Sequence, residues 1–345
     1  MTFSQKILTW YHINKRDLPW RKTRDPYKIW LSEIMLQQTR VAQGMPYYHR
    51  FVEAFPKVGD LANASEEQVL KLWQGLGYYS RARNLHATAK MVANDYQGEF
   101  PNTYKGLKSL KGVGDYTASA IASFCFDLPE PVVDGNVYRV LSRYFDVDLP
   151  INSTEGIKYF KELAREVMDS ENIRDYNQGI MEFGAIQCAP KNPDCESCPL
   201  NESCLALQQN KVAQLPVKLN KTKIRNRYFN YIVLLDDDQN TILEQRKGKG
   251  IWQNLYQFPL IESEKTIQLN DLEEALIEKS ELPKTESLSL YNKEPIVHKL
   301  SHQHLHTQFW VAKTSQQIEN GIPWGKIDTF PVPVLVADFI KTLKI

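Results

Sequence analysis

The sequence predicts two domains of different class: an all-α domain over residues 1–215 and a smaller α+β domain over residues 231–345. Two patterns predict this division. Apolar residues recur at three- and four-residue spacing before residue 215, which is typical of amphipathic helices. Beyond residue 230, short apolar runs bounded by turn residues are typical of strands. The length of 345 residues also exceeds what one hydrophobic core commonly serves.

A basic segment, PVKLNKTKIRNRYFN at residues 216–230, separates the two patterns. It carries five Lys and Arg and no acidic residue, whereas the whole chain is nearly balanced at 42 basic and 41 acidic residues. Such a run is commonly a solvated linker, and its charge also suits contact with nucleic-acid phosphates. We therefore expect a domain linker here.

Neither a signal peptide nor a membrane span is predicted. The first twenty residues carry charges throughout, and no run approaches the roughly eighteen apolar residues that a membrane helix needs. We therefore expect a cytoplasmic protein without membrane contact, associated with the nucleoid if bacterial, in which thiols stay reduced.

Several segments of the first domain predict helices in order: residues 65–76, 81–96 and 156–170. Ser65 is the expected N-cap of the first of these, with acids in its first turn. In the second domain, residues 230–247 predict a strand, a turn at DDDQN and a second strand, residues 269–282 a helix and residues 307–315 another strand.

A glycine-flanked turn divides SLKGVGDYTASAIASF, residues 109–124, into two helices. Gly112 and Gly114 allow a tight turn and a close approach of backbone amides to a ligand. Amides at the start of the following helix are suited to binding a phosphate, and Lys111 adds a positive charge beside it. Taken alone, this pattern also fits an ordinary connecting turn.

Two acidic residues stand in unusual places. Asp134, in EPVVDGNVYRVLSR, precedes a predicted helix; it either caps that helix or serves as an ionised carboxylate held by backbone donors. Glu33 is the single acid in the apolar helix predicted from YKIWLSEIMLQQTRV, residues 27–41. It is either an ordinary buried partner of an arginine or a carboxyl group whose pKa is raised by burial, as a general acid requires.

Four of the five cysteines lie within seventeen positions: Cys188, Cys195, Cys198 and Cys204. A reducing compartment argues against disulfides. Only one pair has the C-x-x-C spacing of a zinc knuckle, and longer arms suit a four-iron cluster that takes one cysteine per iron. Spacing alone leaves zinc and iron–sulfur both open. Cys125, in an apolar helical run, is expected to be a core thiol.

The arrangement C-x6-C-x2-C-x5-C, the hairpin at 109–124 and VVDGNV resemble the endonuclease III superfamily of helix–hairpin–helix DNA glycosylases. Four further stretches resemble its MutY family of adenine DNA glycosylases: LPWR at 18–21, EIMLQQTR at 33–40, GLGYYSRARNL at 75–85 and NQGIMEFGA at 177–185. The resemblance implies an all-α helix–hairpin–helix glycosylase domain with an iron–sulfur loop at 188–204, holding a [4Fe–4S] cluster on the four cysteines, and then an α+β Nudix-like domain.

The resemblance also implies the reaction and its residues. A monomeric enzyme would bind double-stranded DNA containing adenine opposite 8-oxoguanine or guanine, and would excise that adenine. Glu33 would be the general acid, Asp134 would stabilise the sugar cation, and Tyr116 stands where strand-cutting relatives carry a nucleophilic lysine. The other implied site residues are Asn136 beside Asp134, Arg21 and Gln178 in the adenine pocket, and Gln38 and Tyr78 in the gap left in the duplex.

The second domain resembles a Nudix fold at GIWQNLYQFP, residues 250–259. It lacks the R-E-x-x-E-E-x-G helix that holds magnesium in Nudix hydrolases, so we expect a binding module for 8-oxoguanine. The family's F-S-H loop corresponds to Leu300, Ser301 and His302. The alternatives to this overall interpretation are a bifunctional glycosylase–lyase of the endonuclease III kind and a non-catalytic DNA-binding iron–sulfur protein.

Overall fold

The structure, a computed structural model, describes residues 1–219, 223–278 and 282–345. Its chain separates into two compact units, Met1–Asn63 with Asn84–Asn220, and Ala64–Arg83 with Lys221–Ile345. Of the expected linker at 216–230, residues 220–222 lie outside the described residues, and residues from Arg225 onward belong to a strand. The sheet therefore takes up part of the segment that we predicted as a linker.

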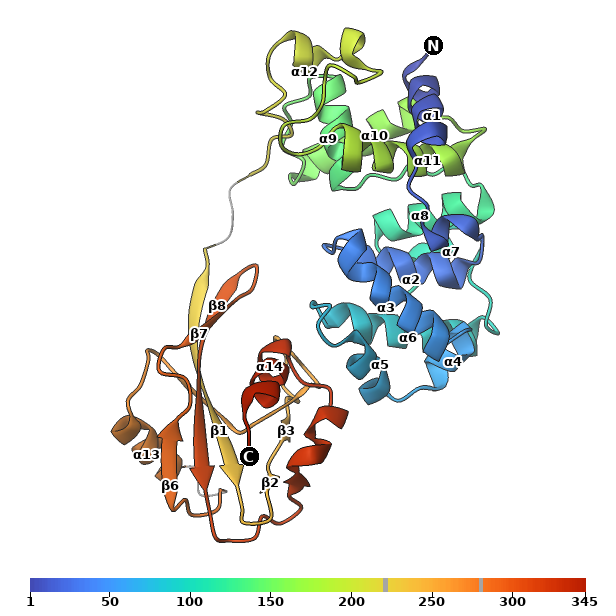
Figure 1. The fold of residues 1–345 in the computed structure, drawn as a ribbon. Coiled ribbons are helices and arrows are strands. Elements are labelled where there is room, and N and C mark those ends of the chain that lie inside the picture. Colours follow the sequence, from blue (N-terminus) through green and yellow to red (C-terminus); the bar gives the residue numbers. More distant parts are fainter. Residues whose placement is uncertain (220–222, 279–281) are drawn as a thin grey trace. The chain divides into compact units, whose positions relative to one another are not determined.

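The first unit is built from helices, as predicted (Figure 1). These are α1 (Phe3–Asn14), α2 (Pro26–Leu36), α3 (Val41–Ala54), α4 (Val58–Asn63), most of α6 (Ser80–Asp95), α7 (Tyr104–Ser109), α8 (Asp115–Phe126), α9 (Gly135–Tyr144), α10 (Thr154–Val167), α11 (Ile173–Glu182) and α12 (Leu205–Gln208). Short 3-10 helices lie at Pro19–Lys22 and Asn201–Ser203, and a π-helical turn at Phe183–Gln187 continues α11.

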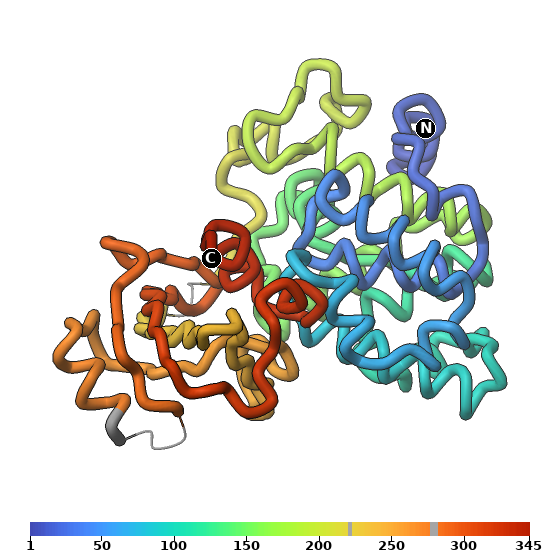
Figure 2. The backbone as a smooth tube through the Cα atoms, turned by 60° about the horizontal axis from the view of Figure 1, so that its bottom comes forward, coloured from blue at the N-terminus to red at the C-terminus, as the bar shows by residue number. Residues whose placement is uncertain are grey.

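One core of this unit joins the two ends of its chain. Helix α1 packs against α11, so the first helix lies beside one of the last (Figures 1 and 2). Ile7 and Trp10 of α1 share a buried cluster with Leu141 of α9, Phe160 of α10 and Ile180 of α11. Burying side chains of this size supplies the main driving force for folding. The packing fixes α9 to α11, which carry or support the acidic residue at 134.

The second unit holds a sheet of five strands in the order β5–β1–β8–β6, with β7 also paired to β8. The bounds are β1 (Arg225–Leu235), β5 (Leu260–Ser263), β6 (Ser287–Leu290), β7 (Ile296–Lys299) and β8 (Gln303–Lys313). Strands β1 and β8 are parallel, and the other pairs are antiparallel. Two small ladders pair β2 (Asn240–Thr241) with β9 (Ile322–Pro323) and β3 (Glu244–Gln245) with β4 (Tyr256–Gln257).

A helix covers each face of this sheet. Ile232 and Trp310 pack with Leu272 of α13 (Leu269–Glu278), whereas Phe309 stacks on Phe339 of α14 (Val334–Thr342) with ring centroids 4.0 Å apart. Because side chains alternate along a strand, β1 is buried on both faces at its C-terminal end. The helix predicted at 269–282 is present as α13 up to Glu278; residues 279–281 lie outside the described part.

The predicted strand–turn–strand at 230–247 is only partly right. The turn is present, since the Asp236 amide donates to the Asn240 carbonyl at 3.2 Å. The return strand, however, is only two residues long and pairs with β9, while β1 pairs with β5 and β8. The turn could be predicted from its own residues, but the partner of a strand depends on residues far away in the sequence.

Residues 64–83 belong with the second unit by their contacts, although we expected them in the first domain. Ser65 is the N-cap of helix α5 (Glu66–Trp73), as predicted, and forms a reciprocal capping box with Gln68. The Lys71 ammonium donates to the Phe330 carbonyl at 3.0 Å, and the 3-10 helix Trp324–Thr329 leads into that contact. Side-chain pairing of this kind leaves no local sequence signature.

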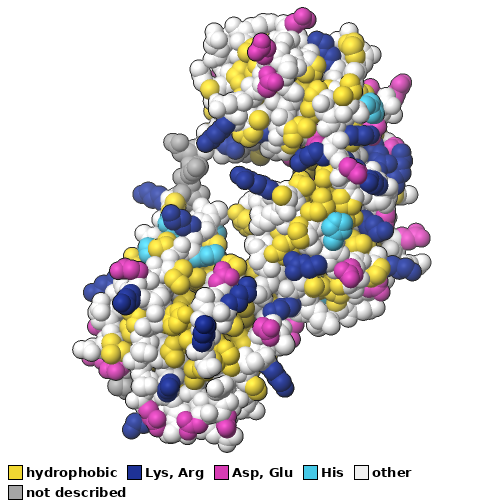
Figure 3. Space-filling view, viewed as in Figure 1, with side chains coloured by type: hydrophobic (Ala, Val, Ile, Leu, Met, Phe, Trp, Pro, Cys, Tyr) yellow, Lys and Arg dark blue, Asp and Glu magenta, His cyan; other side chains and the backbone are white. Residues whose placement is uncertain are grey.

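The surface mixes charges of both signs over the face shown in Figure 3, consistent with a formal net charge of +1. Among residues 1–219, 223–278 and 282–345, we find no helix with the length and apolar character needed to cross a bilayer.

Candidate active site

Glu33 lies in the middle of α2, where the predicted apolar surroundings are present. Asp25 caps this helix by accepting from the Tyr27 amide, and Pro26 occupies its first turn. The Glu33 side chain is buried, with 6% of the residue exposed. Burial, together with the negative charge of Asp134, raises its pKa to about 7, although a hydrogen bond from Tyr116 and the positive charge of Arg21 oppose the rise. The upward direction of the shift agrees with the prediction.

Tyr116 ties the hairpin to Glu33. Its hydroxyl donates to Glu33 Oε2 at 2.6 Å, and it sits in the first turn of α8. The turn between α7 and α8 forms as predicted: Gly112 has φ +75°, a conformation open to glycine, and an added Cβ would come within 2.8 Å of Asn84. Burial and the Glu33 charge raise the pKa of Tyr116 far above its usual range. Tyr116 is therefore a stable hydrogen-bond donor.

Asp134 is the N-cap of α9. Its Oδ1 accepts from the Asn136 and Val137 amides at 2.9 and 2.8 Å, and its Oδ2 accepts from the Asn136 side chain at 2.8 Å. The expected donors are present, yet burial outweighs them and raises the pKa of Asp134. The expectation that Asp134 is ionised at neutral pH stays a prediction. Asp134 is thus the cap of α9, and it also lines the cleft.

These three residues line one cleft of the first unit. Its other predicted members are Arg21, Gln38, Gly112, Gly114 and Asn136. The cleft shares lining residues with a smaller pocket, lined by Trp20, Arg21, Ile29, Glu33, Phe124, Gln178 and Met181. Glu33 borders both spaces, so a group bound in the small pocket would lie against a protonatable carboxyl. Gln38, at the rim, is exposed and has φ +56°, which is an uncommon conformation for a residue other than glycine.

The remaining predicted residues lie elsewhere. Lys111 is exposed on the hairpin turn, and the cleft lining does not include it. Tyr78, 47% exposed, lines a pocket of the second unit together with Ser301 and His302. Four cations line the same pocket: Arg83, Arg225, Arg227 and Lys299. The structure thus places Tyr78, which we predicted in the gap of the duplex together with Gln38, in the pocket that contains the predicted lesion-binding residues Ser301 and His302.

Sequence reasoning missed Glu182, at the end of α11. Its side chain is 1% exposed and binds Arg16 at 2.6 Å and Arg21 at 2.8 Å. Burial works against the charge, but hydrogen bonds from both arginines lower the pKa of Glu182 to about 2. The pair of arginines is thereby held at the cleft wall. The available signal was an acid four residues after Gln178, a spacing that places both on one face of a helix.

The four cysteines of residues 188–204 line a single cavity with Arg143, whose Nη1 lies 3.4 Å from Cys188 Sγ. Burial raises the pKa of Cys198 to about 11. In the described part of the chain, no three His, Cys, Asp or Glu side chains are gathered as a binding set for a metal ion. The donor set, four thiols around one space, nevertheless fits a four-iron cluster with one cysteine per iron. Cys125 is buried, as expected.

Comparison with known proteins defines the class first. The HhH-GPD superfamily of base excision DNA repair proteins matches residues 31–166, and the NUDIX domain matches residues 230–342. A thermostable thymine-DNA glycosylase superposes with a TM-score of 0.56 and 35% identity, over 60% of this chain and 95% of that one. Endonuclease III bound to DNA shares the fold, with a TM-score of 0.52 at 22% identity, over 61% of this chain and 99% of that one. The protein is thus a helix–hairpin–helix DNA glycosylase, a hydrolase of N-glycosidic bonds.

Sequence relatives define the family. The adenine DNA glycosylase of Buchnera aphidicola from Baizongia pistaciae is 37% identical over 90% of this chain and 86% of that protein. The human adenine DNA glycosylase is 43% identical over 62% of this chain and 41% of its own length. The chain belongs to the adenine DNA glycosylase family, and the predicted fold class is confirmed.

Proposed function

We propose that this protein excises adenine from double-stranded DNA in which the adenine is paired with 8-oxoguanine or guanine, leaving an abasic site and an uncut strand. The observation that carries the proposal is the placement of Glu33. A buried carboxyl group with a pKa of about 7 borders both the open cleft and the small pocket. The names of the relatives support adenine as the excised base.

The target nucleotide has to leave the duplex, because neither carboxyl group can reach a stacked base. The small pocket between Trp20, Arg21 and Gln178 would take the adenine, and Glu33 would then lie against it. Glu182 holds Arg21 in place through their 2.8 Å contact. The sugar would remain in the cleft, between Tyr116 and Asp134.

Glu33 would act first as the acid. It donates its proton to adenine N7, the C1′–N9 bond breaks, and the bonding electrons leave with the neutral base. The sugar becomes an oxocarbenium-like cation. Asp134, close enough to Glu33 for its charge to raise that pKa, stabilises this cation electrostatically. A water then adds to C1′ and gives its proton to the Glu33 carboxylate, which restores the acid. The logic is that of two carboxyl groups in glycoside hydrolysis.

Tyr116 is the reason why we propose that the enzyme leaves the strand uncut. A lyase needs an amine that forms a Schiff base with the sugar, and Tyr116 presents a phenol at that place. Within the described ranges of the chain, no lysine is among the residues that line the cleft. The geometry therefore supports a monofunctional enzyme.

Recognition of 8-oxoguanine is assigned to the pocket of the second unit that contains Tyr78, Ser301 and His302. Its hydroxyl, imidazole and amide groups can hydrogen-bond a base edge, and Tyr78 offers an exposed aromatic face for stacking. The four cations around it suit the phosphates of the lesion strand. Leu300 lines the pocket in place of the family's phenylalanine.

We further propose that Cys188, Cys195, Cys198 and Cys204 hold a [4Fe–4S] cluster. When bound, the cluster would cross-link the loop after α11 through four metal–thiolate bonds. Arg143 and Arg139 brace the same loop from α9 by donating to the carbonyls of Ala189 and Cys188, both at 2.8 Å. A DNA substrate places the proposed enzyme with the chromosome, in the cytoplasm, and we propose that it acts as a monomer.

The test uses a duplex with one end-labelled adenine strand opposite 8-oxoguanine, incubated with the cluster-loaded protein and divided in two. One half is treated with hot alkali, which cuts at abasic sites. We expect cleavage only after alkali, at the adenine, and none in a duplex with cytosine opposite 8-oxoguanine. Cleavage without alkali would indicate a lyase, and no cleavage under either condition would leave a DNA-binding protein.

A further inference from the structure

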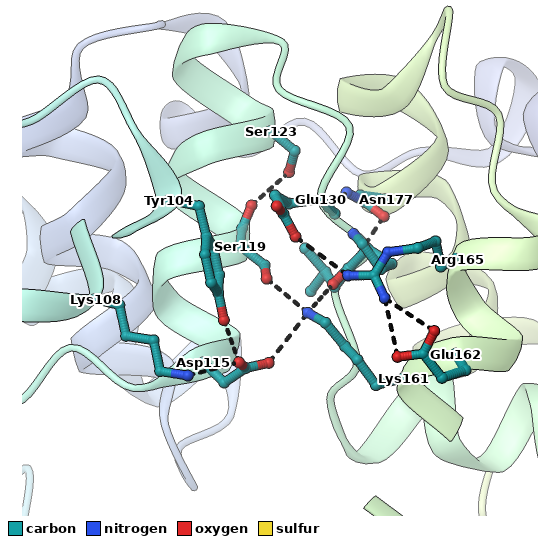
Figure 4. A network of polar contacts seen from close by, with 12 residues as sticks. Tyr104, Lys108, Asp115, Ser119, Ser123, Glu130, Lys161, Glu162, Arg165 and Asn177 are labelled. Atoms are coloured by element: carbon teal, nitrogen blue, oxygen red, sulfur yellow. Dashed lines mark hydrogen bonds and ion pairs between the residues drawn. The ribbon is translucent and has the colours of Figure 1, made fainter. Parts of the chain in front are cut away.

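Lys161 of α10 reaches into the helical unit between two elements that carry the reacting groups (Figure 4). Its side chain is only 17% exposed. The ammonium donates to Ser119 Oγ at 2.8 Å and to the Pro131 carbonyl at 2.7 Å, and lies 3.1 Å from Asp115 Oδ2. An ammonium group has three donors, and each has a partner here. The burial of a charge with this complete a set of partners indicates a defined structural task.

The partners lie next to the catalytic residues in the chain. Asp115 is the residue before Tyr116, and Ser119 follows one turn later on α8. Pro131 precedes Asp134 by three residues, in the loop between α8 and α9. The Asn177 side chain holds the same loop, by donating to the Glu130 carbonyl at 2.9 Å and accepting from the Val132 amide at 3.3 Å. Lys161 touches both the start of α8 and this loop.

We propose that Lys161 is a positioning residue that fixes the start of α8, and with it Tyr116, relative to the loop that ends at Asp134. The inference rests on the proposed excision reaction. A displacement of either group by about 1 Å is enough to cost as much as a hundredfold in rate. Lys161 is not among the described residues that line the cleft, so we expect its loss to change the rate of bond cleavage more than the affinity for DNA.

The chain offers a matched control in Lys108. This lysine also contacts Asp115, at 3.2 Å, but its side chain is 51% exposed and no contact to the 130–132 loop accompanies it. Replacing either Lys161 or Lys108 by an uncharged residue removes one positive partner from Asp115. Burial opposes the charge of the Asp115 carboxylate, but Tyr104 and the two lysines lower its pKa to about 2. When one lysine is replaced, the other still pairs with Asp115.

The experiment measures single-turnover excision of adenine opposite 8-oxoguanine, with enzyme in excess, for wild type, Lys161→Met, Lys161→Gln and Lys108→Met. The dissociation constant for the same duplex and the melting temperature are measured in parallel. We expect Lys161→Met to lower the rate constant by about tenfold to a hundredfold with an unchanged dissociation constant. Lys161→Gln, which keeps two donors, should fall between it and wild type, and Lys108→Met should match wild type.

The outcomes separate cleanly. Rate constants for both Lys161 variants within threefold of wild type would overturn the inference and leave the excision reaction standing. Equal losses in Lys161→Met and Lys108→Met would assign the effect to the charge of Asp115 and also overturn it. If neither Lys161 variant folds, the residue serves stability rather than positioning. An inactive wild type would remove the proposed function together with this inference.

Discussion

The cleft of the first unit and the pocket of the second differ in the burial and the charge of the residues that line them. In the cleft, Glu33 is buried and bonded at 2.6 Å to Tyr116, and its pKa is set by its surroundings. In the pocket, Tyr78 is 47% exposed and four cations line the wall, with no acid among the described residues that line it. The first arrangement suits proton transfer to a bound group, and the second suits recognition of a polyanion and a base. Substitutions in the two places should therefore damage different steps.

The largest effect is expected for Glu33→Gln. The amide keeps the shape of the side chain and cannot donate an acidic proton, so excision should fall by about a thousandfold or more, given the contribution typical of general acids. The affinity for the 8-oxoguanine·adenine duplex should hold or improve, because a buried ionisable group is removed. Single-turnover rates and binding titrations on the same duplex check this. Retention of more than a tenth of the activity would assign the acid to another group.

Asp134→Asn comes next. Asparagine is as good an N-cap as aspartate, so α9 should persist and the melting temperature should change little. The negative charge facing the sugar is lost, however, and the rate should fall by about a hundredfold to a thousandfold. A variant that melts normally and still reacts at the wild-type rate would show that Asp134 is only the cap of α9.

In the pocket, Ser301→Ala and His302→Ala should act on selectivity. Each removes one side-chain hydrogen bond, worth about 1–1.5 kcal/mol, so the preference for 8-oxoguanine·adenine over guanine·adenine should drop by about tenfold. The rate on guanine·adenine should stay near wild type. Competition between the two duplexes measures the ratio. An equal loss on both substrates would mean that the pocket binds DNA without reading the lesion.

The same contrast explains what the sequence could predict. Glu33 and Asp134 stood out because an acid in an apolar helix and an acid before a helix start are local patterns, and the resemblance to the family then implied their roles. The hairpin was legible because Gly112 has a conformation that few residues adopt. Glu182 was missed because its partners, Arg16 and Arg21, lie more than 160 positions away along the chain. The grouping of residues 64–83 with the second unit depends on equally distant contacts, such as that of Lys71 with Phe330.

The pKa of Asp134 depends on more than the motif around it. The donors that we expected from the sequence around Asn136 are all in place. Burial by the assembled cleft nevertheless raises the pKa, and burial is a property of the whole fold rather than of a motif. Lys161 is a similar case, since nothing in its helical surroundings indicates that its ammonium reaches Pro131.

Tyr116→Phe should have the smallest effect on rate and tests the electrostatics of the cleft. The tyrosine hydroxyl stabilises ionised Glu33 and so opposes the effect of burial on a pKa that is about 7 with this hydrogen bond in place; without the hydroxyl, the pKa should rise. A general acid works while protonated, so the rate should stay level at low pH and fall as pH rises through this pKa. In the variant that fall should move to higher pH, with a plateau within about tenfold of wild type. The midpoint of this fall is determined from single-turnover rates measured between pH 5.5 and 9. A midpoint that stays in place, or moves to lower pH, would show that Tyr116 does not set the proton affinity of Glu33 and that burial alone accounts for its protonation.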